Sequence, residues 1–163
     1  MKYIYSLLFI IFSLLSCKSN ADKIKIGILQ LVEHDALDAS YRGFVDGLKE
    51  AGYEDGKNII IDYQNAQGEQ ANCVTIGQKF INDKSDLILA IATPAAQAVA
   101  NMTKDIPILI TAVTDPADSK LVNDNNAPGG NVTGTSDLTP VESQIELLTE
   151  ITPNVKTVGL LYC

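Results

Sequence analysis

Short apolar runs recur along the chain, separated by longer stretches of mixed character. Four of them are KIGILQL (25–31), NIIIDYQ (58–64), DLILAIA (86–92) and PILITAV (107–113). They are rich in isoleucine and lack the strict alternation of apolar and polar residues that marks a strand with one face in water. Runs of this kind are typical of strands buried on both faces of a sheet. The sequence therefore predicts four parallel β-strands.

The stretches between these runs carry helical signals. Three helices are expected, two from apolar residues spaced three or four apart and one from its alanine content. Their markers are Leu37, Tyr41, Phe44 and Leu48; Val74, Gly77, Phe80 and Ile81; and the stretch from Pro94 to Met102. Gly52 stands where the first helix needs a C-terminal cap. Strands and helices in alternation imply right-handed crossovers, and hence an α/β fold with a doubly wound parallel sheet.

Residues 1–17, MKYIYSLLFIIFSLLSC, have a different character. Lys2 precedes an apolar run that is too short to span a bilayer, which is the layout of a cleaved export signal. The stretch Leu14-Leu15-Ser16-Cys17 resembles a bacterial lipobox, in which the cysteine becomes the lipidated first residue. We therefore predict a lipid anchor at Cys17, a tether over residues 18–23, and a location on the cell membrane facing the periplasm or exterior. An ordinary secretion signal and an uncleaved anchor are the alternatives.

Composition excludes several classes of function. The chain has 20 Asp and Glu against 12 Lys and Arg, a net charge of −8, so nucleic acid is a poor partner. The single histidine, His34, lies in Glu33-His34-Asp35 without a second imidazole, so a metal site or catalytic triad lacks its parts, and the trio is interpreted as a helix start. Cys73 is interpreted as core. No glycine-rich phosphate loop follows any strand. We therefore predict no catalytic residue, no metal and no cofactor.

Two helix starts in this sequence invite comparison, because ligands of doubly wound sheets bind beyond the carboxyl ends of the strands. At 139–142, Thr139 and Glu142 form a capping box that occupies the free amides. The start at Thr93-Pro94 has the threonine and the proline but no glutamate. Its amides at Ala95 and Ala96 are therefore expected to be available to an anion at the positive end of the helix dipole. The alternative is that Thr93 only caps its own helix.

Several stretches taken together resemble a known family. They are IGILQLVEH, GYEDGKN, IDYQNAQG, AIATPAAQA, TAVTDP and PGGNVTGTSDLTP. In sum they are similar to the solute-binding lipoproteins of ABC importers of the type linked to tryptophan and other aromatic amino acids. The resemblance implies a type I periplasmic-binding-protein clamshell, whose two lobes close on a small ligand, an amino acid, and which docks on an ABC permease in the membrane. A related sensor domain that hands a signal to a partner is the alternative function.

The resemblance also implies a division of the chain and departs from the family in two ways. It implies a first lobe over residues 24–135, then a hinge crossing and the start of an incomplete second lobe over residues 136–163. Within the latter, a helix is expected over residues 140–151 and a strand at KTVGLLYC (156–163). We expect the chain to be truncated after the first lobe. Family members often have a proline where this chain has Asp35.

The resemblance carries a ligand site onto named positions. It places an amino-acid carboxylate at the helix after the third strand and the ammonium group after the fourth strand. The positions that it reaches are Thr93, Ala95, Thr114 and Asp115. The amide of Ala96 and the carbonyl of Val113 are expected to add a donor and an acceptor beside them. Gln30 and Leu31 are expected to line the wall, and Asp137 to lie on the crossing segment near residues 131–139. The alternative for Asp115 is a turn residue before Pro116.

Overall fold

The computed structural model describes residues 23–159, and its centre is a five-stranded parallel sheet with the order β2-β1-β3-β4-β5. Its strands are β1 (Ile24–Gln30), β2 (Ile59–Asn65), β3 (Leu87–Ile91), β4 (Ile108–Val113) and β5 (Val132–Ser136). The first four lie within one residue of the predicted bounds. The sheet confirms the α/β class and the doubly wound parallel topology.

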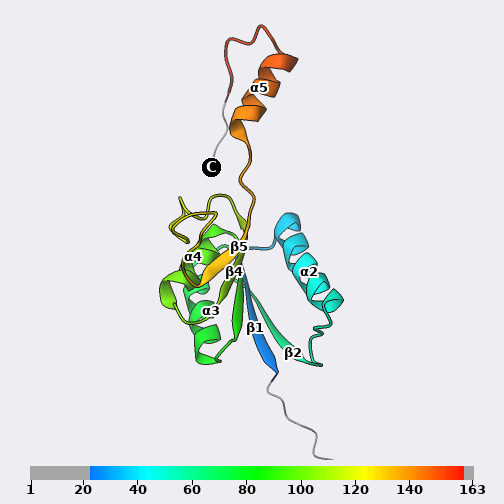
Figure 1. The fold of residues 1–163 in the computed structure, drawn as a ribbon, viewed down its shortest axis with the longest axis vertical. Coiled ribbons are helices and arrows are strands. Elements are labelled where there is room, and N and C mark those ends of the chain that lie inside the picture. The colour runs from blue at the N-terminus through cyan, green and yellow to red at the C-terminus, as the bar shows by residue number, and fades with distance from the viewer. Residues whose placement is uncertain (1–22, 160–163) are drawn as a thin grey trace, which may run out of the picture.

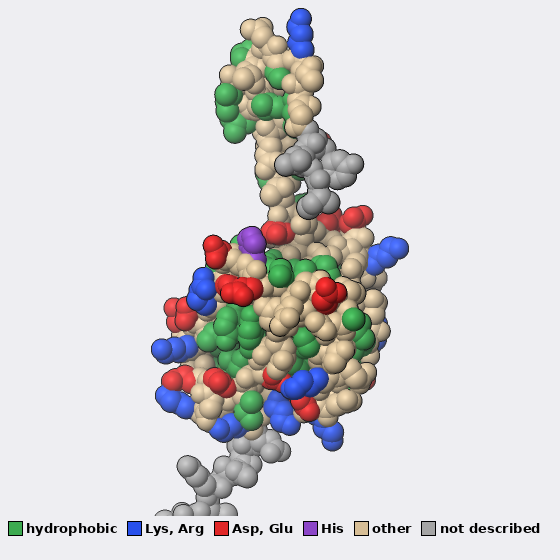
Figure 2. Space-filling view, turned by 180° about the vertical axis from the view of Figure 1, so that it is seen from behind, with side chains coloured by type: hydrophobic (Ala, Val, Ile, Leu, Met, Phe, Trp, Pro, Cys, Tyr) green, Lys and Arg blue, Asp and Glu red, His purple; other side chains and the backbone are tan. Residues whose placement is uncertain are grey.

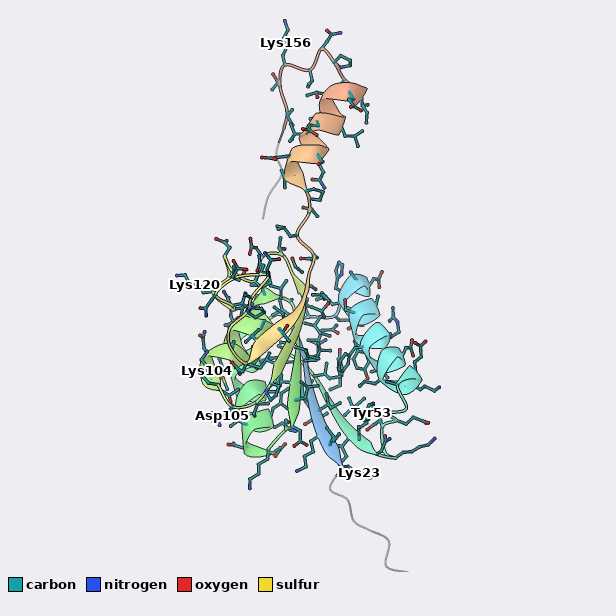
Figure 3. All side chains as sticks on the ribbon, in the orientation of Figure 1. Lys23, Tyr53, Lys104, Asp105, Lys120 and Lys156 are labelled. Carbon is teal, nitrogen blue, oxygen red and sulfur yellow. The ribbon has the colours of Figure 1, made fainter. Side chains whose placement is uncertain are left out.

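Helices cover both faces of the sheet, as Figure 1 shows. The described residues form the helices α2 (Asp35–Glu50), α3 (Gln70–Asn82), α4 (Thr93–Met102) and α5 (Val141–Ile151), of which the first three cover the sheet. Helices α3 and α4 pack together on one face, and α2 lies on the other. Helix α5 stands apart from this body at the end of a linker, and none of its residues is buried. Lys23 lies toward the lower, amino end of the sheet, and Lys120 lies in the loop after β4 (Figure 3).

The larger core lies between the sheet and the helix pair α3 and α4. Phe80 and Cys73 of α3 and Val99 of α4 are fully buried there, which confirms Cys73 as a core residue. Burial raises the pKa of the Cys73 thiol, so this side chain stays protonated and apolar in character. The two helices pack closely at Gly77, where a Cβ would lie 3.1 Å from Cγ1 of Val99. This face is therefore tightly packed.

Among residues 23–159, α2 alone covers the opposite face, and more loosely. The predicted apolar stripe of α2 lies against Ile26, Ile28, Leu89 and Ile91, yet α2 has no fully buried residue. Gly52 takes its expected place after α2 with φ 86°, and Tyr53 donates its amide to the Leu48 carbonyl at 2.8 Å, a Schellman closure. In Figure 2, hydrophobic side chains gather over the middle of the body and most charged ones lie at its rim.

The two ends of the chain follow the sequence predictions only in part. The predicted crossing segment begins with a strand, because β5 pairs in parallel with β4. The predicted capping box of Thr139 and Glu142 was wrong: α5 begins after Pro140, which has no side-chain acceptor, and no side-chain cap forms. Residues 156–159 of the predicted final strand form no strand. The predicted signal, the anchor Cys17 and the tether up to residue 22 lie outside the described residues.

Candidate ligand-binding site

The carboxyl ends of neighbouring strands are joined edge to edge by backbone hydrogen bonds. The Leu31 amide donates to the Ile91 carbonyl at 3.3 Å, the Ala92 amide to Thr111 at 3.0 Å, and the Asp137 amide to Val113 at 3.2 Å. This edge is the upper one in Figure 1, where α2 begins and from which the linker to α5 leaves. The predicted site residues come from four separate stretches of sequence. The structure brings them together at the carboxyl ends of the strands.

Helix α4 begins at this edge one residue earlier than the sequence suggested. Ala92 is the N-cap, Thr93 is the first helical residue, and no side chain caps the helix. The amide of Ala96 donates to the Ala92 carbonyl at 3.0 Å, so the expectation that the Ala96 amide is free was wrong. Within residues 23–159, the amides of Thr93 and Ala95 have no backbone acceptor, and the Thr93 hydroxyl makes no hydrogen bond. Two amides and one hydroxyl therefore stay available at the positive end of the helix dipole.

The backbone at this helix start is strained. Ala92 has φ 85° and ψ 151°, a region that residues with a Cβ rarely adopt. Such a conformation costs about 1–3 kcal/mol and persists only where the surroundings impose it. Here the hydrogen bond from the Ala92 amide to the Thr111 carbonyl helps to hold it in place. Strain of this kind clusters at ligand sites, which adds support to this edge as the candidate site.

The loop after β4 is organised by Asp115. Its Oδ1 accepts hydrogen bonds from the side chain of Asn125 at 2.9 Å and from the amides of Ala117 and Asp118 at 3.0 and 3.1 Å. The hydrogen bond from Asn125, followed by that from the Asp118 amide, lowers the pKa of Asp115 below its ordinary value. One oxygen of this carboxylate thus caps a turn, as the alternative interpretation expected. A lowered pKa keeps the group ionised, so its second oxygen, Oδ2, can still face a cation.

Val113 and Thr114 also have partners at this edge. The Val113 carbonyl accepts from the Asp137 amide, and the Thr114 carbonyl accepts from the Ser136 hydroxyl at 2.6 Å. These two contacts tie the end of β4 to the end of β5. Thr114 and Asp137 have exposed side chains, whereas Val113 is buried. Only the backbone of Val113 can therefore contribute to a ligand site.

The side chain of Gln30 holds the loop between β1 and α2 by hydrogen bonds. Its side chain is fully buried, and Nε2 donates to the Val32 carbonyl at 2.9 Å and to Oδ1 of Asp38 at 2.6 Å. Its Oε1 has no hydrogen-bond partner in the part of the chain that the structure describes. Leu31, the next residue, is half-buried against the larger core. Gln30 thus fixes the loop that carries Val32 and His34 to the first turn of α2.

His34 has the structural role that the sequence suggested, and it also borders a cavity that sequence reasoning missed. It is the N-cap of α2, with Nδ1 accepting the Ala36 amide at 3.2 Å. The cavity has a volume of about 530 Å³ and lies between the start of α2 and the ends of β4 and β5. Its lining is Val32, His34, Ala36, Leu37, Ser40, Thr111, Ala112, Thr135, Ser136 and Asp137. Asp137 alone was predicted, because the others come together only through tertiary packing.

Two negative observations apply to residues 23–159. This part of the chain holds no group of three or more His, Cys, Asp or Glu side chains placed to bind a metal ion. It also contains no helix that combines the length and the apolar character needed to cross a membrane.

Comparison with known proteins identifies the class. Residues 25–163 match the family described as ABC transporter substrate binding protein, and the chain belongs to this family. Proteins of this family are the extracytoplasmic substrate-binding components of ABC transporters. The chain is 51% identical over 146 residues to the tyrosine-binding protein of Clostridioides difficile (strain R20291). The aligned residues make up 89% of this chain and 42% of that protein.

Solved structures agree with this class. The ABC domain of Streptococcus pneumoniae in complex with L-Trp is 47% identical with a TM-score of 0.77, over 83% of this chain and 45% of that one. A leucine binding protein of Thermotoga maritima, 14% identical with a TM-score of 0.58 over 80% of this chain and 37% of that one, shares the fold alone. The fold is therefore that of a type I periplasmic binding protein. The chain spans less than half the length of these relatives.

Proposed function

We propose that this protein is the extracytoplasmic solute-binding component of an ABC importer, and that it binds an amino acid with an aromatic side chain. The relatives at 51% and 47% identity are named for tyrosine and crystallised with L-Trp, respectively, which supports this ligand class. In this proposal the ligand lies between two lobes, of which residues 24–135 form the first, and is delivered to a membrane permease. Lipidation at Cys17 holds the protein at the membrane. The family match favours import over the sensor alternative.

The start of α4 carries the proposal. The amides of Thr93 and Ala95 and the hydroxyl of Thr93 are donors without acceptors in the described chain, and they lie at the positive end of a helix without a side-chain cap. An α-carboxylate fits such a place, because it gains charge-assisted hydrogen bonds and a favourable dipole interaction together. Ala96 contributes a buried wall rather than a donor.

The end of β4 offers the complementary charge. Asp115 is held ionised by its hydrogen bonds, and its Oδ2 has no partner within residues 23–159. The carbonyl of Val113 and the hydroxyl of Thr114 lie beside it in the chain. An ammonium group needs acceptors of this kind. Donors on α4 and acceptors after β4 therefore match the two charged groups of an amino acid.

Nuclear magnetic resonance on the 163-residue chain tests this function, with L-tryptophan and tryptamine as probes. Tryptamine keeps the indole and the ammonium group but lacks the carboxylate. We expect L-tryptophan to shift the amide signals of Thr93 and Ala95, and tryptamine to leave them unchanged. The amide of Gly43, on the exposed side of α2, serves as the internal control. Equal shifts with both probes, or none with either, would rule out carboxylate binding at α4.

A further inference from the structure

The cavity beside His34 is a mixed pocket with a specific polar inventory. Its apolar walls come from Val32, Leu37 and Ala112, which are all half-buried. Its volume of about 530 Å³ is in the range of small-molecule sites. The polar side chains around it are His34, Ser40, Thr111, Thr135, Ser136 and Asp137. What this pocket can recognise depends on which of these groups still lack a partner.

Three of the four hydroxyls around the pocket already donate a hydrogen bond. Ser40 donates to the Ala36 carbonyl at 3.1 Å, and Ser136 donates to the Thr114 carbonyl at 2.6 Å. Thr135 donates to the hydroxyl of Thr111 at 3.0 Å. Within residues 23–159, the carboxylate of Asp137 and Nε2 of His34 have no hydrogen-bond partner. These two groups therefore stand out as free to meet a ligand.

The cap of α2 decides what His34 can offer. Because Nδ1 accepts the Ala36 amide, the proton of the neutral imidazole lies on Nε2. The free nitrogen is therefore a donor. Asp137, the first residue after β5, supplies an acceptor in the same pocket. The pocket thus presents an imidazole donor and a carboxylate acceptor beside its apolar walls.

The pocket adjoins the start of α4. Thr111 of the pocket pairs with Ile91, two residues before Thr93, and the Ala92 amide donates to the Thr111 carbonyl. Neighbouring strands lie about 4.8 Å apart, so the pocket begins within about one or two strand spacings of the carboxylate position proposed above. The side chain of an amino acid bound at Thr93 can therefore extend into it.

We propose that this pocket receives the side chain of the ligand and selects an aromatic ring that carries a polar edge group. A phenol accepts from Nε2 of His34 and donates to the carboxylate of Asp137. An unsubstituted phenyl ring fills the same space but leaves both groups without a partner. His34 is thus a specificity-determining residue as well as a helix cap. This inference rests on the function proposed above.

The test compares L-tyrosine with L-phenylalanine as probes, by the same amide titration of the 163-residue chain. His34→Asn is the decisive variant, because asparagine is among the best N-caps and keeps α2 anchored while it withdraws the Nε2 donor. We expect the wild-type preference for tyrosine to fall about 3- to 10-fold in His34→Asn, with phenylalanine affinity unchanged. Asp137→Asn should also reduce the preference. Ser40→Ala, in the same pocket, should not, because its hydroxyl is already satisfied within α2.

The outcomes separate this inference from the function on which it rests. If His34→Asn has the same unfolding temperature as the wild type but loses the preference for tyrosine, the pocket has the proposed role. If both amino acids bind but the ratio is the same in wild type and His34→Asn, the specificity role is wrong while the function stands. If neither amino acid shifts any amide signal of the wild-type chain, both the proposed function and this inference are wrong.

Discussion

Gly27 of β1 lies directly against the ring of Phe80 of α3. A Cβ at position 27 would come within 2.7 Å of Cγ and Cδ2 of that ring. Phe80 is fully buried, so its ring has no free space into which to move. The absence of a side chain at Gly27 is therefore what allows α3 to approach the centre of the sheet.

Gly27→Ala should destabilise the domain. Overpacking a rigid core costs about 1–3 kcal/mol, which urea unfolding followed by circular dichroism can measure. Gly43→Ala is the matched control, since position 43 lies on an exposed turn of α2 with nothing within 4 Å of a new Cβ. That change should stabilise by up to about 1 kcal/mol through helix propensity. If the ring causes the loss, Gly27→Ala should cost less in a Phe80→Leu background; an equal cost there would contradict the packing argument.

A salt bridge between α3 and β2 makes the stability of the domain depend on pH. Lys79 of α3 forms salt bridges with Asp62 and Asp83. Desolvation raises the pKa of Asp62, but hydrogen bonds from Lys79 and Gln64 outweigh it and hold the pKa below its ordinary value. A lowered pKa in the folded state contributes stability above the unfolded value, about 3.9. That contribution is lost as the pH falls through the lower folded value.

Asp62→Asn should therefore reduce stability at neutral pH and flatten the acid limb of the stability curve below about pH 4. Because the pair is partly exposed, the expected loss at neutral pH is about 0.2–1 kcal/mol. Thermal unfolding between acid and neutral pH measures it. Asp46→Asn is the control, since its carboxylate makes no ion pair or hydrogen bond in the part of the chain that the structure describes. An acid limb as steep in Asp62→Asn as in the wild type would contradict the assignment.

The central strands were predictable because burial on both faces leaves an uninterrupted apolar run in the sequence. Strand β5 was harder to see. Of VTGTS only Val132 is buried, and the other four residues are exposed at the edge of the sheet. Backbone pairing with β4 holds this strand, and pairing leaves no apolar pattern. Gly134 shows how close that pairing is, since a Cβ there would lie 2.0 Å from the Ile110 carbonyl oxygen.

The two helix starts show where sequence reasoning about the site reached its limit. Thr139 and Glu142 have capping-box spacing, but the helix begins one residue later, which moves Glu142 out of the position from which it can reach back. At α4 the shift runs the other way, because Ala92 adopts a positive φ and becomes the cap. A displacement of one residue decides which amides are free. Local spacing does not fix it, since tertiary hydrogen bonds such as Ala92 to Thr111 do.

The membrane anchor gives a third prediction, on residues before the described part of the chain. If Cys17 is acylated, Cys17→Ser should release the protein from the membrane fraction, because serine has no thiol to carry the lipid that inserts in the bilayer. Fractionation of cells that express each form measures this. Cys73→Ser is the matched control, since Cys73 is buried in the core and should not affect membrane attachment. Unchanged membrane association of Cys17→Ser would exclude the lipoprotein interpretation.

The last prediction concerns Thr93, whose hydroxyl makes no hydrogen bond within residues 23–159 although the side chain is half-buried at the start of α4. Thr93→Val keeps the shape and the β-branch and removes only the hydroxyl. If that hydroxyl donates to a ligand carboxylate, affinity for L-tryptophan should fall by about 1–3 kcal/mol, the cost of leaving a buried polar partner unpaired. Thr75→Val is the control, since the Thr75 hydroxyl donates to the Ala71 carbonyl on the exposed side of α3. Amide titration of both variants gives the comparison. A Thr93→Val chain that binds as well as the wild type would mean that the carboxylate lies elsewhere on this edge.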